Sequence, residues 1–314
     1  MDNLIFSLNA VAPVFVIVFL GAFLKRKGIT DDKFNSMATN MVFKVALPVL
    51  LFRDVASADF SNVFDIRLIL FVLIGTVLQL SAFWIIGSVF VKERPSLGAF
   101  VQGAFRGNFA FIGLPLAYNL FGQQGLAKCA VLLSFTIPLY NVLATILLTV
   151  TSPNADSSNI EGIIKSIIKN PLIISIVLAL PFSYFHIQLP QIASKSIEYL
   201  SGIALPMALL SMGGTFSFTA VKRCVNLSLA AAFLKIVLSP LVFTLLAFYM
   251  GFRGYSLGSV FIVFGAPSAV TSYVMAKAMD SDSELAASIV LMSTLGSIFT
   301  LFAGIFIFKS MGIM

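Results

Sequence analysis

Asn108-Phe-Ala-Phe-Ile-Gly-Leu-Pro115 lies inside one long apolar segment of this chain, and Gly265-Ala-Pro267 lies inside another. A proline inside a helix removes a backbone donor and clashes with the preceding turn, so Gly-x-Pro in such a segment predicts a broken helix. In lipid, the backbone groups that a break frees must be satisfied by protein or by a wet cavity. The sequence therefore predicts two interrupted helices that cross inside the protein, with Gly113, Pro115, Gly265 and Pro267 at the breaks. Because Pro115 lies toward the outer end of its apolar segment, an earlier start of the first unwound segment, near Asn108, stays open.

The composition places the chain in a membrane. Of its 314 residues, 59% are hydrophobic and 11% are charged, and the mean hydropathy is +1.02. Soluble chains contain about 45 to 50% apolar and about 25% charged residues, so soluble enzymes, disordered chains and disulfide-rich domains are excluded. The net charge of +7 comes mostly from basic residues between apolar segments. Basic loops orient a membrane protein in the bilayer. The charge therefore predicts the lipid bilayer as a partner and does not indicate binding to nucleic acid.

The whole chain divides into apolar segments of transmembrane length. A bilayer core about 30 Å thick needs about 20 apolar residues per helix. Ten segments meet this requirement approximately, and Pro181 predicts a bend or an early end in the sixth. The expected fold class is an all-α polytopic membrane protein with ten transmembrane helices, at 5–24, 34–52, 68–91, 97–121, 129–150, 171–187, 199–218, 227–250, 257–276 and 285–308.

The Lys and Arg residues between these segments predict the orientation. Alternate loops on one side hold eleven of them, against six on the other side. The side with more basic residues normally faces the cytoplasm, so we expect both termini outside the cytoplasm, in the inner or plasma membrane.

Short motifs recur about half a chain apart and in the same order. Ala46-Leu47-Pro48 matches Ala204-Leu205-Pro206, and the two Gly-x-Pro motifs match each other. Since five segments is an odd number, the second copy must enter the membrane from the opposite side, as in many secondary transporters. We expect two inverted repeats, at 1–150 and 170–314. The linker at 151–169 is expected to lie on the cytoplasmic surface as a short helix or, equally, to extend the sixth segment.

The distribution of acidic residues disfavours a cation substrate. All 13 Asp and Glu fall in loops or at segment ends, whereas cation exchangers normally keep a carboxylate at membrane depth. Each broken helix would also expose the unpaired amides of a helix start, which carry about half a positive charge. The crossing therefore predicts an anion site.

Two kinds of side chain are candidates for this site. Arg106 and Lys44 are basic residues at depth, and each either serves the site or packs inside the bundle. Lys235 is expected to extend to the membrane surface instead. The neutral polar candidates for substrate binding are Asn108, Ser134, Asn141, Ser268 and Thr271, although any of them could join helices instead. The sequence predicts no metal ligands, no cofactor and no nucleophile paired with a base, so an enzyme is not expected.

The motifs resemble those of the auxin efflux carrier family, which includes bacterial permeases for malate and malonate. Asn108 through Pro115 is similar to the family's fourth-helix motif, Ala266-Pro267 to its ninth-helix motif, and Tyr140-Asn141 to a fifth-helix pair. The resemblance implies a scaffold of helices 1, 2, 6 and 7, often dimeric, and a transport domain of helices 3–5 and 8–10. It also implies that Asn108 contacts the substrate. Ser268 replaces the Gln of plant members, which puts indole-acetate transport in doubt.

The expected function is secondary transport of a small organic anion, a carboxylate or dicarboxylate, by an elevator type of alternating access. Two alternatives stay open: a receptor on a transporter-like fold that moves nothing, and a carrier of another anion such as a bile-acid-like compound. The sequence leaves coupling to H⁺ or Na⁺ open, and the resemblance implies a homodimer.

Overall fold

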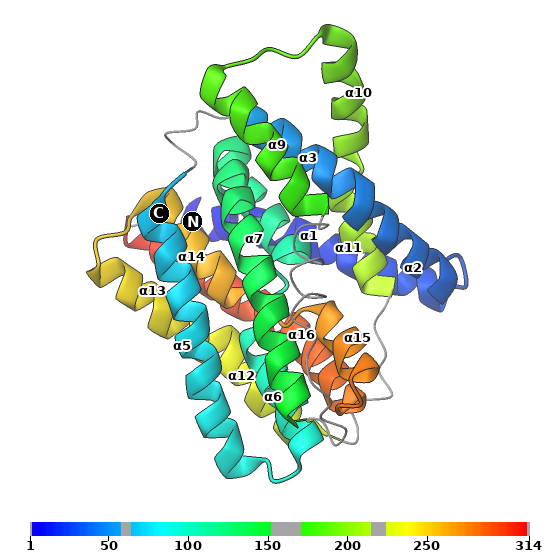
Figure 1. The fold of residues 1–314 in the computed structure, drawn as a ribbon, viewed down its shortest axis with the longest axis vertical. Coiled ribbons are helices and arrows are strands. Elements are labelled where there is room, and N and C mark those ends of the chain that lie inside the picture. The colour runs from blue at the N-terminus through cyan, green and yellow to red at the C-terminus, as the bar shows by residue number, and fades with distance from the viewer. Residues whose placement is uncertain (1, 58–63, 152–170, 215–223, 313–314) are drawn as a thin grey trace.

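The structure is a computed structural model that describes residues 2–57, 64–151, 171–214 and 224–312. Within these ranges the regular structure is helical, apart from one isolated β-bridge. The expected linker at 151–169 lies outside the described residues, except for Thr151. In chain order the elements are α1 (Asp2–Arg26), α2 (Asp32–Met41), the π-helix η1 (Val42–Ala46), α3 (Leu47–Ala56), α5 (Ile66–Phe90), α6 (Arg94–Phe105), the π-helix η2 (Phe109–Gly113), α7 (Leu114–Thr151), α9 (Pro171–Phe185), α10 (Gln191–Gly202), α11 (Ala204–Gly214), α12 (Val225–Phe233), the π-helix η4 (Leu234–Leu238), α13 (Ser239–Tyr249), α14 (Gly254–Gly265), α15 (Val270–Ala278) and α16 (Ser283–Ser310) (Figure 1).

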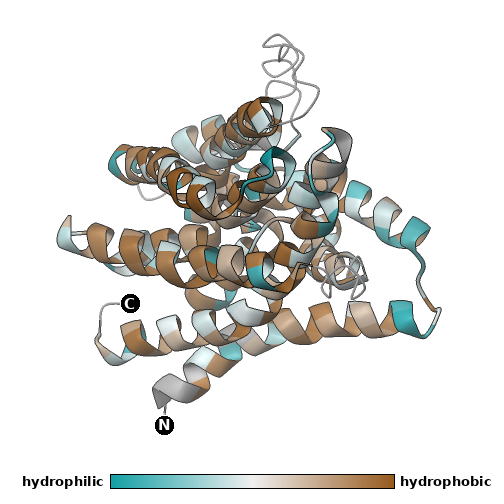
Figure 2. Ribbon diagram, turned by 90° about the horizontal axis from the view of Figure 1, so that it is seen from below, coloured by the Kyte–Doolittle hydropathy of each residue, from teal (hydrophilic) through white to brown (hydrophobic). Residues whose placement is uncertain are grey.

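The protein is a multi-pass helical membrane protein. Seven helical segments of the described chain are long and apolar enough to cross a bilayer, and Figure 2 shows hydrophobic residues along most of the helices. Large apolar side chains face outward, as with Phe90 at 72% exposure and Phe299 at 74%. Such surfaces suit lipid, not water. The longest segment, 109–151, turns at Gly122, whose φ of 64° marks a kink between two helices.

The helices pack as two groups, which meet where α7 contacts both and where α16 of the second group packs against α1 of the first. The first helix group is α1–α3 with α9–α11, and the second helix group is α5, α6 and α12–α16. In Figure 1, α2, α3, α10 and α11 of the first group lie to the right, α1 crosses the middle of the view, and α5, α6 and α12 of the second group lie below. Within the first group α1 and α11 touch through their backbones, since an added Cβ at Gly213 would stand 1.8 Å from the carbonyl oxygen of Val18.

Acidic residues begin several of the helices, which explains their positions outside the apolar segments. A side-chain oxygen of Asp31 accepts from the backbone N–H of Phe34, and Asp65 and Asp282 cap α5 and α16 in the same way. A carboxylate at a helix start satisfies an unpaired amide and matches the positive end of the dipole.

Each π-helix in the part of the chain that the structure describes ends two residues before a proline, and this corrects one expectation. The pairs are η1 before Leu47-Pro48, η2 before Leu114-Pro115, and η4 before Ser239-Pro240. In η2 the N–H of Leu114 reaches back five residues to the carbonyl of Phe109. This wider turn accommodates the missing donor of the proline, so the helix continues through Pro115. The prediction of a break at Gly113 and Pro115 was wrong, and the unwound segment lies near Asn108, as the alternative had it.

Candidate functional site

Two extended segments, one between α6 and η2 and one between α14 and α15, cross each other inside the body that the second helix group forms with α7. The first begins after α6 ends at Phe105, and the second begins after α14 ends at Gly265. Arg106 at φ −83°, ψ 106° and Ala266 at φ −57°, ψ 136° are the first residues outside helical geometry. Pro267 therefore lies within its break as predicted, with Gly265 at its edge. The other break lies at 106–108, seven residues before Pro115.

Backbone hydrogen bonds join the two segments as a short antiparallel bridge. Gly107 pairs with Ser268. On one side the N–H of Asn108 donates to the carbonyl of Pro267 at 2.6 Å, and on the other the N–H of Ala269 donates to the carbonyl of Arg106 at 3.0 Å. These bonds satisfy four backbone groups that the breaks free, as the membrane interior requires.

Ser268 fixes the crossing from both sides. Its side chain is fully buried and its Oγ donates to the carbonyl of Gly103 at 2.5 Å, in the last turn of α6. Its backbone N–H donates to Oγ of Ser293 on α16 at 3.0 Å. A serine at this position thus holds together three elements, which indicates a structural role in addition to the predicted role in substrate binding.

Four helix ends meet at the crossing. The C-terminal ends belong to α6 and α14, and the N-terminal ends begin at Asn108, before η2 and α7, and at Ala269, before α15. Neither N-terminal end has a side-chain cap. Helix C-termini carry about half a negative charge and N-termini about half a positive charge. The crossing therefore contains charges of both signs, fixed by the backbone.

Asn108 lies where the crossing meets the first helix group. Its side chain is 4% exposed, and its Nδ2 donates to Sδ of Met212 on α11 at 3.4 Å. A thioether is a weak acceptor, so this contact leaves most of the amide's hydrogen-bonding capacity to a stronger partner.

The side chain of Arg106 lies between α7 and α15 of the second helix group. It is 7% exposed, its Nη2 donates to Oδ1 of Asn141 on α7 at 2.7 Å, and its Nη1 contacts the sulfur of Met275 on α15. In the described ranges the buried polar and charged side chains include no Asp or Glu. This guanidinium therefore contributes positive charge that no buried carboxylate of those ranges neutralises.

The remaining sequence candidates make no contact with these residues among the hydrogen bonds of the described chain. Ser134 is half-buried on α7, and its Oγ donates to the carbonyl of Val131 in its own helix. Thr271 is exposed, but it lies in the first turn of α15, two residues after Ala269. Lys44 in η1 is exposed. The structure therefore brings together Asn108, Arg106, Asn141 and Ser268, with Thr271 beside the helix start at Ala269. No group of three or more potential metal ligands occurs among the residues that the structure describes.

Lys235 reverses an expectation and adds a residue to the crossing. Its side chain is fully buried and does not extend to the membrane surface. Its Nζ donates to the carbonyl of Phe264 at 2.8 Å, one residue before the end of α14. Ser239 and Gln79 extend this contact, because Gln79 Nε2 donates to Ser239 Oγ at 2.9 Å. The sequence reasoning missed this network, whose signal was a stripe of small and polar residues along α12.

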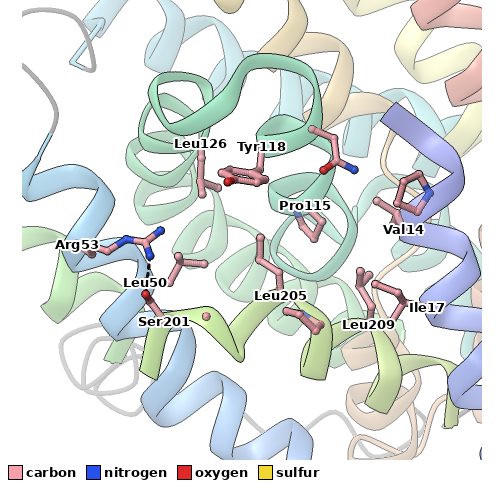
Figure 3. A pocket seen from close by; sticks show the side chains of 14 residues that line it. Val14, Ile17, Leu50, Arg53, Pro115, Tyr118, Leu126, Ser201, Leu205 and Leu209 are labelled. Atoms are coloured by element: carbon pink, nitrogen blue, oxygen red, sulfur yellow. Dashed lines mark hydrogen bonds between the residues drawn. The ribbon is translucent and has the colours of Figure 1, made fainter. Parts of the chain in front are cut away.

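A cavity of about 300 Å³ lies between α1, α3 and α11 of the first helix group and the start of α7. Figure 3 shows Arg53 and Tyr118 at its wall, with Nη1 of Arg53 donating to Oγ of Ser201 at 2.7 Å. Leu209, also at the wall, stands about one helical turn before Met212, the partner of Asn108. The cavity thus approaches the face of the crossing that carries Asn108.

Comparison with known proteins identifies the family. The profile of the membrane transport protein family matches residues 6–304. The chain belongs to this family. Its members and the relatives below are transporters, not enzymes.

Three relatives match nearly full length. An "Uncharacterized transporter" of Methanothermobacter thermautotrophicus is 27% identical, over 94% of this chain and 96% of the relative. A second "Uncharacterized transporter", from Methanocaldococcus jannaschii, is 25% identical over 91% of this chain and 94% of the relative. A "Putative malonate transporter" of Rhizobium meliloti is 22% identical, over 96% and 95%.

Proposed function

We propose that this member of the membrane transport protein family is a secondary transporter of a small organic anion that carries a carboxylate. The supporting observation is the uncapped N-terminal ends at Asn108 and Ala269, beside the buried Arg106, with no buried acid among the described residues. Unpaired amides and a guanidinium at depth bind anions well and cations poorly.

We also propose the ten-helix, inverted-repeat architecture for this function. Gly107 and Ser268, paired at the crossing, are 161 positions apart. The same offset exchanges Arg106 with Pro267 and Asn108 with Ala269, so it exchanges the two backbone bonds of the bridge. α6 and α14 have 12 residues each. A two-fold relation between the halves accounts for this pattern. It relates the halves by an offset nine positions larger than the offset that aligns the two Gly-x-Pro motifs.

The proposed movement carries the second helix group, with α7, past the first helix group, which acts as the scaffold. The cavity at Arg53 and Tyr118 supports this division, because it lies where the two bodies meet. The scaffold would also form the homodimer, for which light scattering of the purified protein in detergent is the test.

A dicarboxylate is the substrate class that the charges support best. Two helix starts of about half a charge each, together with one guanidinium, amount to about two positive charges. A dianion neutralises them, which lowers the cost of moving the loaded site through a low-dielectric medium. The relative from Rhizobium meliloti is named a "Putative malonate transporter", and malonate is a dicarboxylate.

Uptake by proteoliposomes tests this proposal. We expect labelled malonate to accumulate under an imposed gradient, and Asn108→Ala to lose most of this uptake. Asn40→Ala, at an exposed position of α2, is the matched control and is expected to transport normally. Wild-type flux in the Asn108 variant would remove the site assignment. Binding of malonate without flux would favour a receptor, and flux of larger anions alone would favour a bile-acid-like substrate.

A further inference from the structure

Lys235 contacts the crossing on the side of its negative helix ends. Its Nζ donates to the carbonyl of Phe264 at 2.8 Å. An added Cβ on Gly107 would stand 3.2 Å from the same Nζ, so the amine also lies against the other extended segment. The side chain is fully buried, so the amine lies in the protein interior.

A small network extends this contact to both C-terminal ends. Ser239 Oγ also donates to the carbonyl of Phe264, at 3.2 Å. Gln79 Nε2 donates to Ser239 Oγ at 2.9 Å and to the carbonyl of Ala104 at 3.3 Å. Ala104 and Phe264 are each the last residue but one of their half-helix, α6 and α14. The network therefore joins the last turns of the two half-helices.

The charges at this place match one ammonium group. Two helix C-termini carry about half a negative charge each, so that together they amount to about one. Burying an ammonium without compensation is costly, and these ends supply the compensation. Among the buried side chains of the described ranges no Asp or Glu could do so instead.

The same helix ends could hold a free cation. In transporters with discontinuous helices, half-helix C-termini and unwound carbonyls coordinate Na⁺ or take up H⁺. We propose that the Lys235 ammonium is a tethered cation in the place of such a coupling ion, so that the crossing forms and binds its anion without sodium. Lys235 is then a positioning residue, which acts on the substrate through the geometry of the two segments. Only the transport arm of the test rests on the proposed function.

Thermal stability of the purified variants in different salts tests this inference without any substrate. Lys235→Ala removes the ammonium and leaves a space beside the Phe264 carbonyl and the Ser239 hydroxyl. We expect its melting temperature to fall in choline chloride and to recover in sodium, potassium or butylammonium chloride. The wild type and Lys44→Ala are expected to melt alike in all four salts, since Lys44 also lies in a π-helix before a proline but is exposed.

Two further variants cover the case in which Lys235→Ala does not fold. Lys235→Met fills the space without charge, so we expect low stability in every salt. Lys235→Arg keeps the charge and is expected to restore folding. Equal stability of the Met variant and the wild type would overturn the inference. A folded Ala variant that none of the cations stabilises, or an Arg variant that fails like the Met variant, would also overturn it.

Transport supplies the second arm. Malonate uptake by the wild type is expected to be equal in sodium and choline, while uptake by Lys235→Ala should be at least about tenfold higher in sodium, a factor that corresponds to about 1.4 kcal/mol. Sodium-dependent uptake by the wild type would overturn the inference. If no variant transports a carboxylate, the proposed function fails while the salt dependence of stability still decides the role of Lys235.

Discussion

Replacing Ser268 by Ala removes one side-chain hydrogen bond at the crossing and keeps its backbone bonds. The lost donor is the Oγ that reaches the carbonyl of Gly103 at 2.5 Å. An unsatisfied buried acceptor costs about 1 to 3 kcal/mol, whereas hydrogen bonds between membrane helices average about 0.6 and reach about 1.7 kcal/mol. Because Gly103 lies in the last turn of its helix, no further turn is present to replace the donor. We expect a cost near the upper end of the membrane range, about 1.5 kcal/mol.

Thermal unfolding of the purified protein, followed by fluorescence-detected size exclusion, measures this cost. For a chain of this size about 1.5 kcal/mol corresponds to a melting temperature lower by about 3 °C. Ser81→Ala is the control, because Ser81 is exposed and its Oγ donates to the carbonyl of Val77 within its own helix. That variant should stay within about 0.5 kcal/mol of the wild type. Equal melting temperatures for the two variants would refute the role assigned to Ser268.

Two other substitutions probe the packing of the first helix group and the charge of the site. Gly213→Ala is expected to destabilise the protein by about 3 kcal/mol or more, because its Cβ would collide with the backbone carbonyl of Val18. The control Gly202→Ala, whose Cβ would meet nothing within 4 Å, should melt like the wild type. Equal melting temperatures of the two variants would contradict the close approach of α1 and α11. Arg106→Gln should raise the KM for malonate about 10- to 150-fold, the loss of a charged hydrogen bond worth about 1.5 to 3 kcal/mol; an unchanged KM in proteoliposomes would exclude contact between this residue and the substrate.

The sequence predicted the location of the crossing better than its cause. Proline spacing indicated breaks in both halves, and the structure has them, but in the first half the break precedes Pro115 by seven residues. A proline does not determine by itself whether a helix breaks. Where the preceding turn widens to a π-helix the missing donor is tolerated, and the choice depends on packing that hydropathy does not describe. Asn108, at the actual break, was nevertheless among the predicted substrate contacts.

The burial of Lys235 was predictable from a different signal. The depth of a lysine along a helix does not tell which face of the helix carries it. Around Lys235 the buried positions of α12 and its continuation include the small residues Ser228, Ala231, Ala232 and Ser239 as well as Leu234 and Ile236, while Phe233 is exposed at 56%. In a membrane, small and polar residues at helical spacing mark the face that packs against other helices. Lysine in that stripe points inward, which a count of turns from the membrane surface misses.

The contacts at the crossing differ in strength in a way that favours the proposed movement. The bonds that hold the two segments together run between backbone groups, from the Ser268 hydroxyl to the carbonyl of Gly103, and to Ser293, all within the second helix group and its crossing segments. The bond from Asn108 to the first helix group ends on the sulfur of Met212 at 3.4 Å. Breaking a bond to a thioether costs less than leaving a buried amide or carbonyl unpaired. This difference supports the proposed movement, in which the crossing would slide along α11 as a unit. Met212→Leu, which removes the acceptor at nearly constant volume, should then leave the rate of transport within about threefold of the wild type, since volume-conserving swaps cost little.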